Sequence, residues 1–280
     1  PYQPTDLGSG GRGSAGAGTA GGGAIRIQAG SIVNNGRISS NGLEATSGNY
    51  TTAGSGGSVW ITTNSLNGSG DIQTNGGSFT NGASNTRPAG GGGRIAIYIS
   101  NTNNFTGSIT SYPGVKANNM ASAAPGTIYL QQGSNKGELR IDGGDLQTPL
   151  STAKTFYNNG NKTLDAFTIK NANIIIKNQS TLEITEFIKK TINGSLDNSL
   201  TIEAGSVVKM AELKEEGNLA VVNQGAFEPI NQDFTFIKSV WTGAGEYNFA
   251  GKNITVDDGA SIEFNQRIDK PQAVKNLVIK

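Results

Sequence analysis

The first half of the chain repeats one short motif four times, and this repetition limits the folds that the chain can adopt. Each copy has Gly-Gly or Pro-Gly followed by a strand in which aliphatic residues alternate with others. The leading aliphatic residues are Ile25, Val59, Ile95 and Ile128, at steps of 34, 36 and 33 residues. A second short strand follows in each copy, centred on Ile38, Ile72, Ile109 and Leu139. Near-constant steps with this content predict a solenoid, in which neighbouring repeats bury one another's apolar faces.

Alternation within the strands predicts which side chains point inward. Successive side chains of a strand point to opposite faces, so Ile25 and Ile27 share one face, as do their counterparts in the later copies. We therefore predict an all-β fold, a single-stranded parallel β-helix (β-solenoid) with right-handed winding. The outward column opposite the aliphatic residues holds Arg26, Trp60, Ala96 and Tyr129.

Glycine content divides the chain into two regions of one continuous solenoid. Residues 1–145 are predicted to form Gly-rich coils with long excursions, and residues 146–280 to continue the helix with tighter corners. The Gly/Ser/Asn tracts of the first region are interpreted as turns, where these residues accept positive φ. Strand–corner–strand motifs recur in the second region, at 167–176, 200–209, 219–227 and 254–264.

An antiparallel β-sandwich is the competing all-β interpretation, because it also consists of many short strands. Its strands are not expected to repeat one sequence at a fixed step. The repeat therefore favours the solenoid.

Composition excludes several classes of function. The chain has no Cys and no His, which removes disulfides, thiolate nucleophiles, Ser-His-Asp triads and the usual zinc sites. Lys and Arg number 22 against 21 acids, a net charge of +1 without basic runs, so we expect no nucleic-acid partner. We also expect no membrane span and no cofactor, because the chain lacks a long apolar stretch and cofactor motifs in the required context.

Several segments resemble glycine-rich parallel β-helix modules of large bacterial cell-surface proteins and adhesins. They are 56–61, 68–77, 90–99 and 124–130, and residues 200–210 are similar to a strand–corner motif common in β-helical adhesins. The resemblance covers most of the chain and implies a parallel β-helix, export, and a role in adhesion or surface architecture. It carries over no catalytic residues.

Three aromatic residues are the candidate carbohydrate-binding residues. Trp60 and Tyr129 are predicted in one outward column two coils apart, roughly 9–10 Å at about 4.8 Å per coil, with Tyr98 nearby. Exposed rings on a rigid sheet can stack on the apolar faces of sugars. The alternative is that these rings pack on one another or are covered by a Gly-rich excursion.

Acidic residues offer weaker candidates. Asp142 and Asp145 beside Arg140, and later Asp257/Asp258, lie at Gly-containing corners where Asp is a common turn residue. Asp142 and Asp145 are a weak candidate Ca²⁺ site, and we otherwise predict no metal site and no catalytic residues. Because β-helices also carry such activities, a polysaccharide lyase or glycoside hydrolase is the alternative function.

These observations lead to one functional hypothesis. We predict a non-catalytic bacterial cell-surface adhesin or structural stalk module, located outside the cell, whose outward face binds extracellular polysaccharide or a host or neighbouring surface. The chain opens on Pro1 without Met or a signal segment, so we expect it to be a piece of a longer polypeptide.

Overall fold

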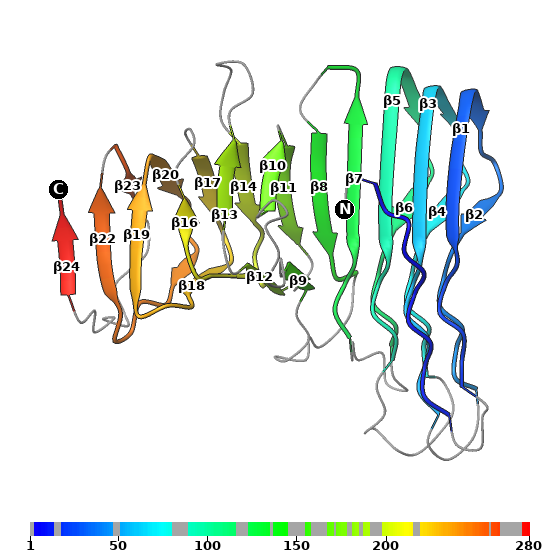
Figure 1. Ribbon diagram of the computed structural model, residues 1–280. Coiled ribbons are helices and arrows are strands. Elements are labelled where there is room, and N and C mark those ends of the chain that lie inside the picture. The colour runs from blue at the N-terminus through cyan, green and yellow to red at the C-terminus, as the bar shows by residue number, and fades with distance from the viewer. Residues whose placement is uncertain are drawn as a thin grey trace. The chain divides into compact units, whose positions relative to one another are not determined.

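The computed structural model describes most of the chain in two compact units, Pro1–Lys154 and Thr155–Lys280 (Figure 1). The described residues are 3–13, 18–46, 51–79, 89–115, 123–134, 137–144, 155–157, 167–170, 172–177, 181–184, 187–190, 198–214, 219–257, 259–263 and 276–280. They form strands and contain no helix; most of the strand pairs are parallel, and β7–β8 is antiparallel. The predicted all-β class is confirmed for this part of the chain.

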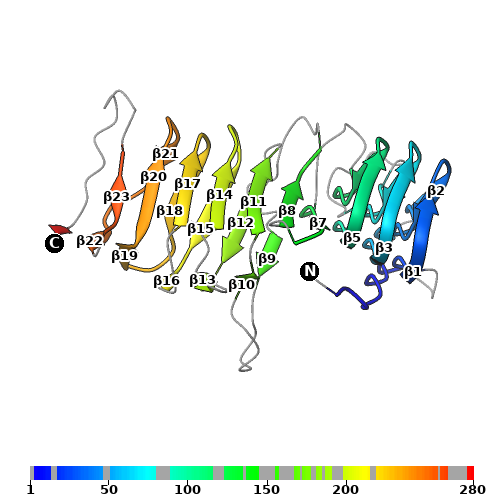
Figure 2. The ribbon, with the colours of Figure 1, turned by 90° about the horizontal axis from the view of Figure 1, so that it is seen from above.

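The first unit has two sheets. Its strands are β1 (Ala24–Val33), β2 (Arg37–Ser39), β3 (Ser58–Gly68), β4 (Asp71–Gln73), β5 (Arg94–Phe105), β6 (Ser108–Thr110), β7 (Thr127–Gln132) and β8 (Gly137–Asp142). One sheet has the order β1-β3-β5-β7-β8 and the other β2-β4-β6. Seen from above, β1, β3 and β5 repeat side by side as successive layers (Figure 2).

The repeat predicts the register of these strands correctly. Ile25 pairs with Val59, Val59 with Ile95 and Ile95 with Ile128, all in parallel. In the second sheet Ile72 lies between Ile38 and Ile109. The strands therefore stack repeat upon repeat, as predicted for the first three copies.

Inward-facing aliphatic residues form the core of the first unit. The fully or almost fully buried members are Val59, Ile61, Leu66, Ile72, Ile95, Ile97, Ile99 and Ile128. Burying one such side chain contributes about 1.5–3 kcal/mol relative to leaving it exposed. The core is thus a narrow stack of aliphatic residues between the two sheets.

The fourth copy departs from the predicted layout. Its second strand, β8, pairs with β7 in an antiparallel manner, with Tyr129 opposite Leu139, and does not continue the sheet of β2, β4 and β6. Strand alternation gives the same inward and outward pattern in either direction, so the sequence could not reveal this reversal.

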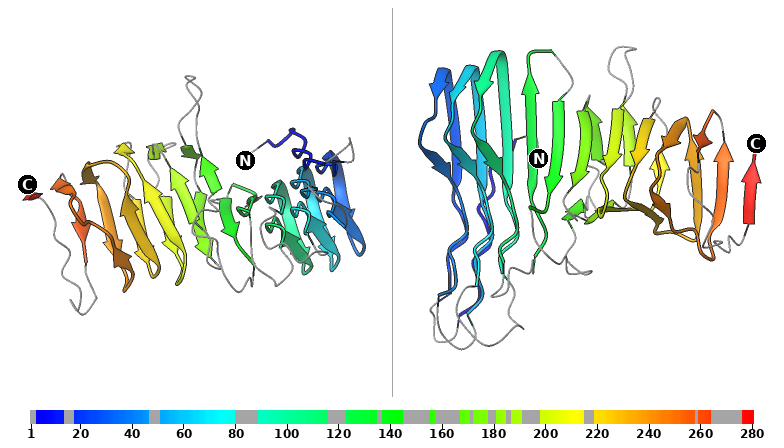
Figure 3. Two further views of the ribbon diagram at one scale, coloured as in Figure 1. Left: turned by 90° about the horizontal axis from the view of Figure 1, so that it is seen from below. Right: turned by 180° about the vertical axis from the view of Figure 1, so that it is seen from behind.

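The glycine-rich tracts form an ordered hydrogen-bonded lattice, which we call the glycine lattice (Figure 3, right). Its segments are 8–13, 18–23, 40–45, 51–57, 74–79, 89–93, 111–115 and 124–126. Along 52–57 every third backbone N–H donates to the same neighbouring segment. Thr52 and Ser55 donate to Arg12 and Ser9 of one segment. Gly54 and Gly57 donate to Leu43 and Ser40 of a second segment, and Gly56 donates to Gly91 of a third, all at 2.7–3.1 Å. This period of three is that of a polyproline II helix, which has no internal hydrogen bonds.

Close approach of neighbouring backbones explains most of the glycines of this lattice. A Cβ atom added at Gly57 would overlap the backbone of Gly22 and Gly23, and one at Gly93 would overlap Gly57. None of the described lattice glycines has positive φ. The interpretation of these tracts as positive-φ turns is therefore wrong: glycine is needed because backbones touch.

The second unit consists of shorter strands. They are β9 (Thr155–Tyr157), β10 (Phe167–Lys170), β11 (Ala172–Lys177), β12 (Thr181–Ile184), β13 (Phe187–Lys190), β14 (Asn198–Ile202), β15 (Val207–Met210), β16 (Leu213–Lys214), β17 (Leu219–Asn223), β18 (Ala226–Pro229), β19 (Asp233–Ile237), β20 (Ser239–Thr242), β21 (Glu246–Tyr247), β22 (Asn253–Asp257), β23 (Ser261–Ile262) and β24 (Asn276–Ile279). The sheets of this unit are β11-β14-β17-β20-β23, β21-β18-β15-β12-β9, β19-β22-β24 and β10-β13-β16.

Consecutive strands of the second unit enter different sheets in rotation. Leu200 pairs with Val221 and Val221 with Trp241, all in parallel. The sequence predicts that Ile254 repeats this motif, but Ile254 pairs with Phe234 in another sheet. The core contains buried aliphatic residues of β11–β17 and an aromatic cluster. In this cluster Phe227, Phe234, Phe236, Trp241, Tyr247 and Phe249 pack at centroid distances of 4.5–6.4 Å. That the two units form one continuous solenoid stays a prediction.

Candidate functional site

The predicted outward column exists in the first unit. Arg26 pairs with Trp60, Trp60 with Ala96 and Ala96 with Tyr129 across β1, β3, β5 and β7. Tyr98 lies two residues beyond Ala96 and faces the same side. The structure thus places all three predicted aromatic residues on one face of one sheet.

The three rings do not form an open row. The guanidinium carbon of Arg26 lies 4.3 Å from the centroid of the Trp60 ring, a cation–π arrangement that covers this face. Tyr129 is only 3% exposed, because Gly137 of β8 lies against its ring. The expectation that Tyr129 is exposed is wrong, and the reversed strand β8 is the reason.

Tyr98 and Tyr129 pack on one another. Their ring centroids are 5.5 Å apart at an interplanar angle of 52°, and the Tyr129 hydroxyl donates to Gln131 Oε1 at 3.2 Å. Burial and the neighbouring Tyr129 raise the pKa of the Tyr98 phenol well above its ordinary value. Burial also raises the pKa of Tyr129. Both phenols therefore stay neutral at physiological pH and act as hydrogen-bonding groups.

A groove of about 540 Å³ lies on the same face and includes Tyr98 in its wall. It extends across β1, β3, β5 and β7. Its lining consists of Gln28, Ala29, Gly30, Thr62, Thr63, Asn64, Tyr98, Ile99, Ser100, Gln131 and Gly133. Amide, hydroxyl and phenol groups are therefore present in the lining, and they can exchange hydrogen bonds with a polar ligand.

A β-bulge in β5 lies at the groove. Thr63 pairs with Ile99 whereas Ser65 pairs with Thr102, so β5 has one residue more than β3 between these two pairs. Such an insertion bends the strand and re-aims nearby side chains. Ser100 lies at the bulge, and its hydroxyl donates to Asn64 Oδ1 at 2.8 Å.

The groove is electrically neutral. None of its lining residues is an acid, a lysine or an arginine. Glycoside hydrolysis of the usual kind needs two carboxylates roughly 5–10 Å apart, and this lining supplies none. The arrangement can bind an uncharged polar ligand by hydrogen bonds and by one aromatic face.

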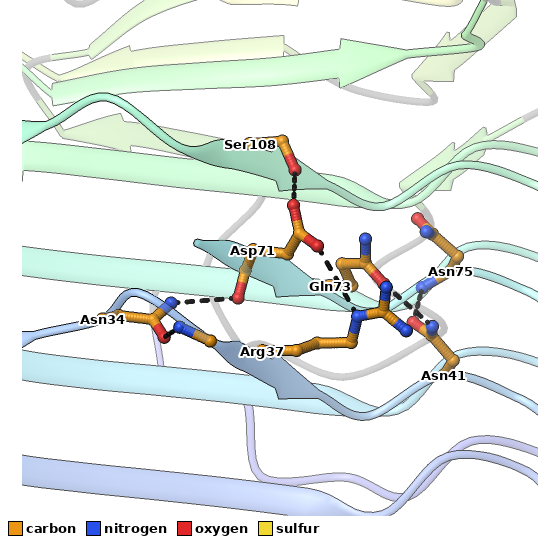
Figure 4. Close-up of polar contacts among 8 residues, drawn as sticks. Asn34, Arg37, Asn41, Asp71, Gln73, Asn75 and Ser108 are labelled. Carbon is orange, nitrogen blue, oxygen red and sulfur yellow. Dashed lines mark hydrogen bonds and ion pairs between the residues drawn. The ribbon is translucent and has the colours of Figure 1, made fainter. Parts of the chain in front are cut away.

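A second polar cluster lies on the sheet of β2, β4 and β6 (Figure 4). Arg37, Asp71 and Ser108 occupy one register column. Ser108 Oγ donates to one Asp71 carboxylate oxygen at 2.6 Å, and Arg37 Nε lies 3.5 Å from the other. The carboxylate is thus held by both neighbours, and the column joins successive repeats.

Amide side chains continue this cluster at the adjacent corner. Asn41 Nδ2 donates to Gln73 Oε1 at 3.2 Å, and Asn41 Oδ1 accepts from the Asn75 backbone N–H at 2.7 Å (Figure 4). Asn75 Oδ1 in turn accepts from the Tyr112 N–H at 2.8 Å. Since these groups satisfy one another between repeats, we assign the cluster a structural role.

The weak Ca²⁺ candidate is not assembled among the described residues. Asp142 is 6% exposed, and its carboxylate accepts the Gly144 N–H at 3.0 Å. Asp145 and Asp258 lie outside the described residues. Within the described ranges, no three His, Cys, Asp or Glu side chains gather as a set of metal ligands. The same ranges also contain no helix that could cross a membrane.

Sequence reasoning missed the amide and hydroxyl lining of the groove, although a signal for the bulge was present. Ile25 to Ile38 and Val59 to Ile72 both span 13 residues, whereas Ile95 to Ile109 span 14. The extra residue is the one inserted in β5.

Comparison with known proteins found no matching family model, no matching curated protein and no matching solved structure.

Proposed function

We propose that this chain is a right-handed parallel β-helix that serves as a non-catalytic adhesin or structural stalk module on a bacterial cell surface. In this proposal the groove on β1, β3, β5 and β7 binds polysaccharide. The stacked, in-register strands supply a rigid platform, and the glycine lattice adds backbone hydrogen bonds between repeats.

The single observation that carries the proposal is the groove itself. It is uncharged, rich in amide and hydroxyl groups, and bounded on one side by Tyr98. Sugars present the complementary chemistry, because their hydroxyls donate and accept hydrogen bonds and their ring faces are apolar. The same lining offers no carboxylate pair, which favours binding over the alternative of a lyase or glycosidase.

A binding assay with a paired turnover assay tests this function. The chain is incubated with a panel of insoluble polysaccharides, and both the retained protein and any released sugar are measured. We expect retention without released product. The double variant Tyr98→Ala/Asn64→Ala should lose retention about tenfold or more, because it removes a ring face and a hydrogen-bonding amide.

The control is Gln224→Ala, which truncates an exposed amide in the second unit. Equal retention of wild type and double variant would refute the groove as the site. Release of sugar products by the wild type would refute a non-catalytic role. Antibody labelling of intact source cells tests the surface location.

A further inference from the structure

The groove is longer across the strands than along them, and this difference indicates the direction in which an elongated ligand lies. Its lining spans four adjacent strands, β1, β3, β5 and β7. Three strand spacings amount to roughly 14 Å. Along each strand it spans only residues equivalent to 28–30, or about 7 Å. An elongated ligand therefore fits across the strands and not along them.

The two outward columns of the groove repeat from strand to strand. One column is Gln28, Thr62, Tyr98 and Gln131, paired in register. The second set in the lining is Gly30, Asn64, Ser100 and Gly133, each two residues further along the chain. Each strand thus presents its own small set of contacts at intervals of about 4.8 Å, which is close to the length of one pyranose unit in an extended glycan.

We infer that the groove binds an uncharged glycan whose chain crosses the strands, with one sugar unit over each strand. This inference rests on the proposed function and specifies the ligand of the same site. The lining contains no charged group. Arg26, on the neighbouring column, is stacked on Trp60. A uronic acid polymer would have to desolvate carboxylates without partners, which is costly.

The inference predicts how affinity depends on chain length. Isothermal titration calorimetry is performed with cello- and manno-oligosaccharides of one to six units and with oligogalacturonides of the same lengths. For a neutral series we expect affinity to rise about two- to tenfold per unit up to four units, since each strand adds about one hydrogen bond. Beyond four units it should level off. Oligogalacturonides should bind at least about tenfold more weakly than neutral chains of equal length.

A groove-filling variant tests the placement of single sugars. Gly30 lies at the β1 end of the groove, and a Cβ there would meet no atom within 4 Å. Gly30→Tyr should therefore cover the β1 position, so that affinity levels off at three units and the tetrasaccharide loses its advantage. Gly23→Tyr is the matched control, because Gly23 has the same open surroundings and lies outside the groove.

The possible results separate this inference from the proposed function. Three results would overturn the placement of one sugar on each strand. They are an affinity that does not depend on oligosaccharide length, a preference for oligogalacturonides, and a loss of affinity in Gly30→Tyr that is equal at every length. Retention on polysaccharide without binding of any oligosaccharide would also overturn it, and would leave the proposed function standing. If neither polymer nor oligosaccharide binds, the proposed function itself fails.

Discussion

Single backbone positions decide whether the glycine lattice can form. Gly23, Gly57, Gly93 and Gly126 directly precede β1, β3, β5 and β7. The carbonyls of the first three accept the N–H groups that begin β3, β5 and β7. Each of the last three lies so close to the preceding repeat that a Cβ would overlap its backbone. The glycine before β3, β5 and β7 is therefore a steric requirement of stacking, whereas Gly23 before β1 has open surroundings.

Alanine substitution separates steric need from conformational freedom. Gly57→Ala should lower the free energy of unfolding by about 1–3 kcal/mol, because backbone atoms must move to make room for the methyl group. Gly23→Ala should be neutral or stabilise by about 0.4–1 kcal/mol, since its surroundings are open and its φ is not positive. Urea denaturation of both variants measures the difference, and equal stabilities would contradict the lattice.

Tyr98 gives the protein a specific response to alkali. Its pKa in the folded state lies above the unfolded value of about 10. Between these values the unfolded state binds fewer protons, so stability falls as pH rises, and the contribution is complete below pH 10.

In Tyr98→Phe the decline of stability above about pH 10 should be shallower than in wild type. Between pH 6 and 9 the two stability profiles should run parallel. Chemical denaturation at a series of pH values checks this. Identical slopes in the alkaline range would show that Tyr98 titrates as it does in the unfolded chain.

At the scale of elements, the β-bulge in β5 is one additional residue in a strand that lines the groove. Asn101 lies between Ser100 and Thr102, where β5 has its extra residue relative to β3. The Asn101 carbonyl accepts a hydrogen bond from the Gln132 side chain at 2.8 Å. A side chain of β7 thus stabilises the bulge, which is part of the structure of the groove.

Deleting Asn101 should restore uninterrupted pairing of β3 with β5. The expected result is a folded chain whose melting temperature changes little and whose retention on polysaccharide drops about tenfold or more, because a flatter sheet loses the concave wall. Thermal melts monitored by circular dichroism, together with the retention assay, measure both. Undiminished retention would show that the bulge does not shape the site.

Sequence patterns predicted elements better than their connections. The step between Ile25, Val59, Ile95 and Ile128 gave the correct parallel register. The predicted direction of β8 was wrong, because the alternation of inward and outward residues is the same in a parallel and an antiparallel strand. The groove depends on which side chains of four separate strands come together, so only Tyr98 of its lining was found in advance.

For the molecule as a whole, charge balance sets how binding responds to salt. The chain carries a net charge of +1 and the groove is uncharged. Affinity for a neutral oligosaccharide should therefore change by less than about twofold when ionic strength rises from about 0.05 M to about 0.5 M. Titrations at both salt concentrations test this. A steep fall with salt, as seen for proteins that bind phosphate backbones, would point to an anionic ligand.

The glycine lattice has a thermodynamic consequence for the first unit. Unfolding it exposes mainly peptide groups and few apolar carbons, because its segments consist largely of Gly, Ser, Thr and Asn. Hydration of apolar surface raises the heat capacity on unfolding, whereas hydration of polar surface lowers it. These segments therefore add little or even subtract from the heat-capacity increment, and they flatten the curve of stability against temperature. A fold with this makeup keeps its stability in the cold better than one built around a large hydrocarbon interior.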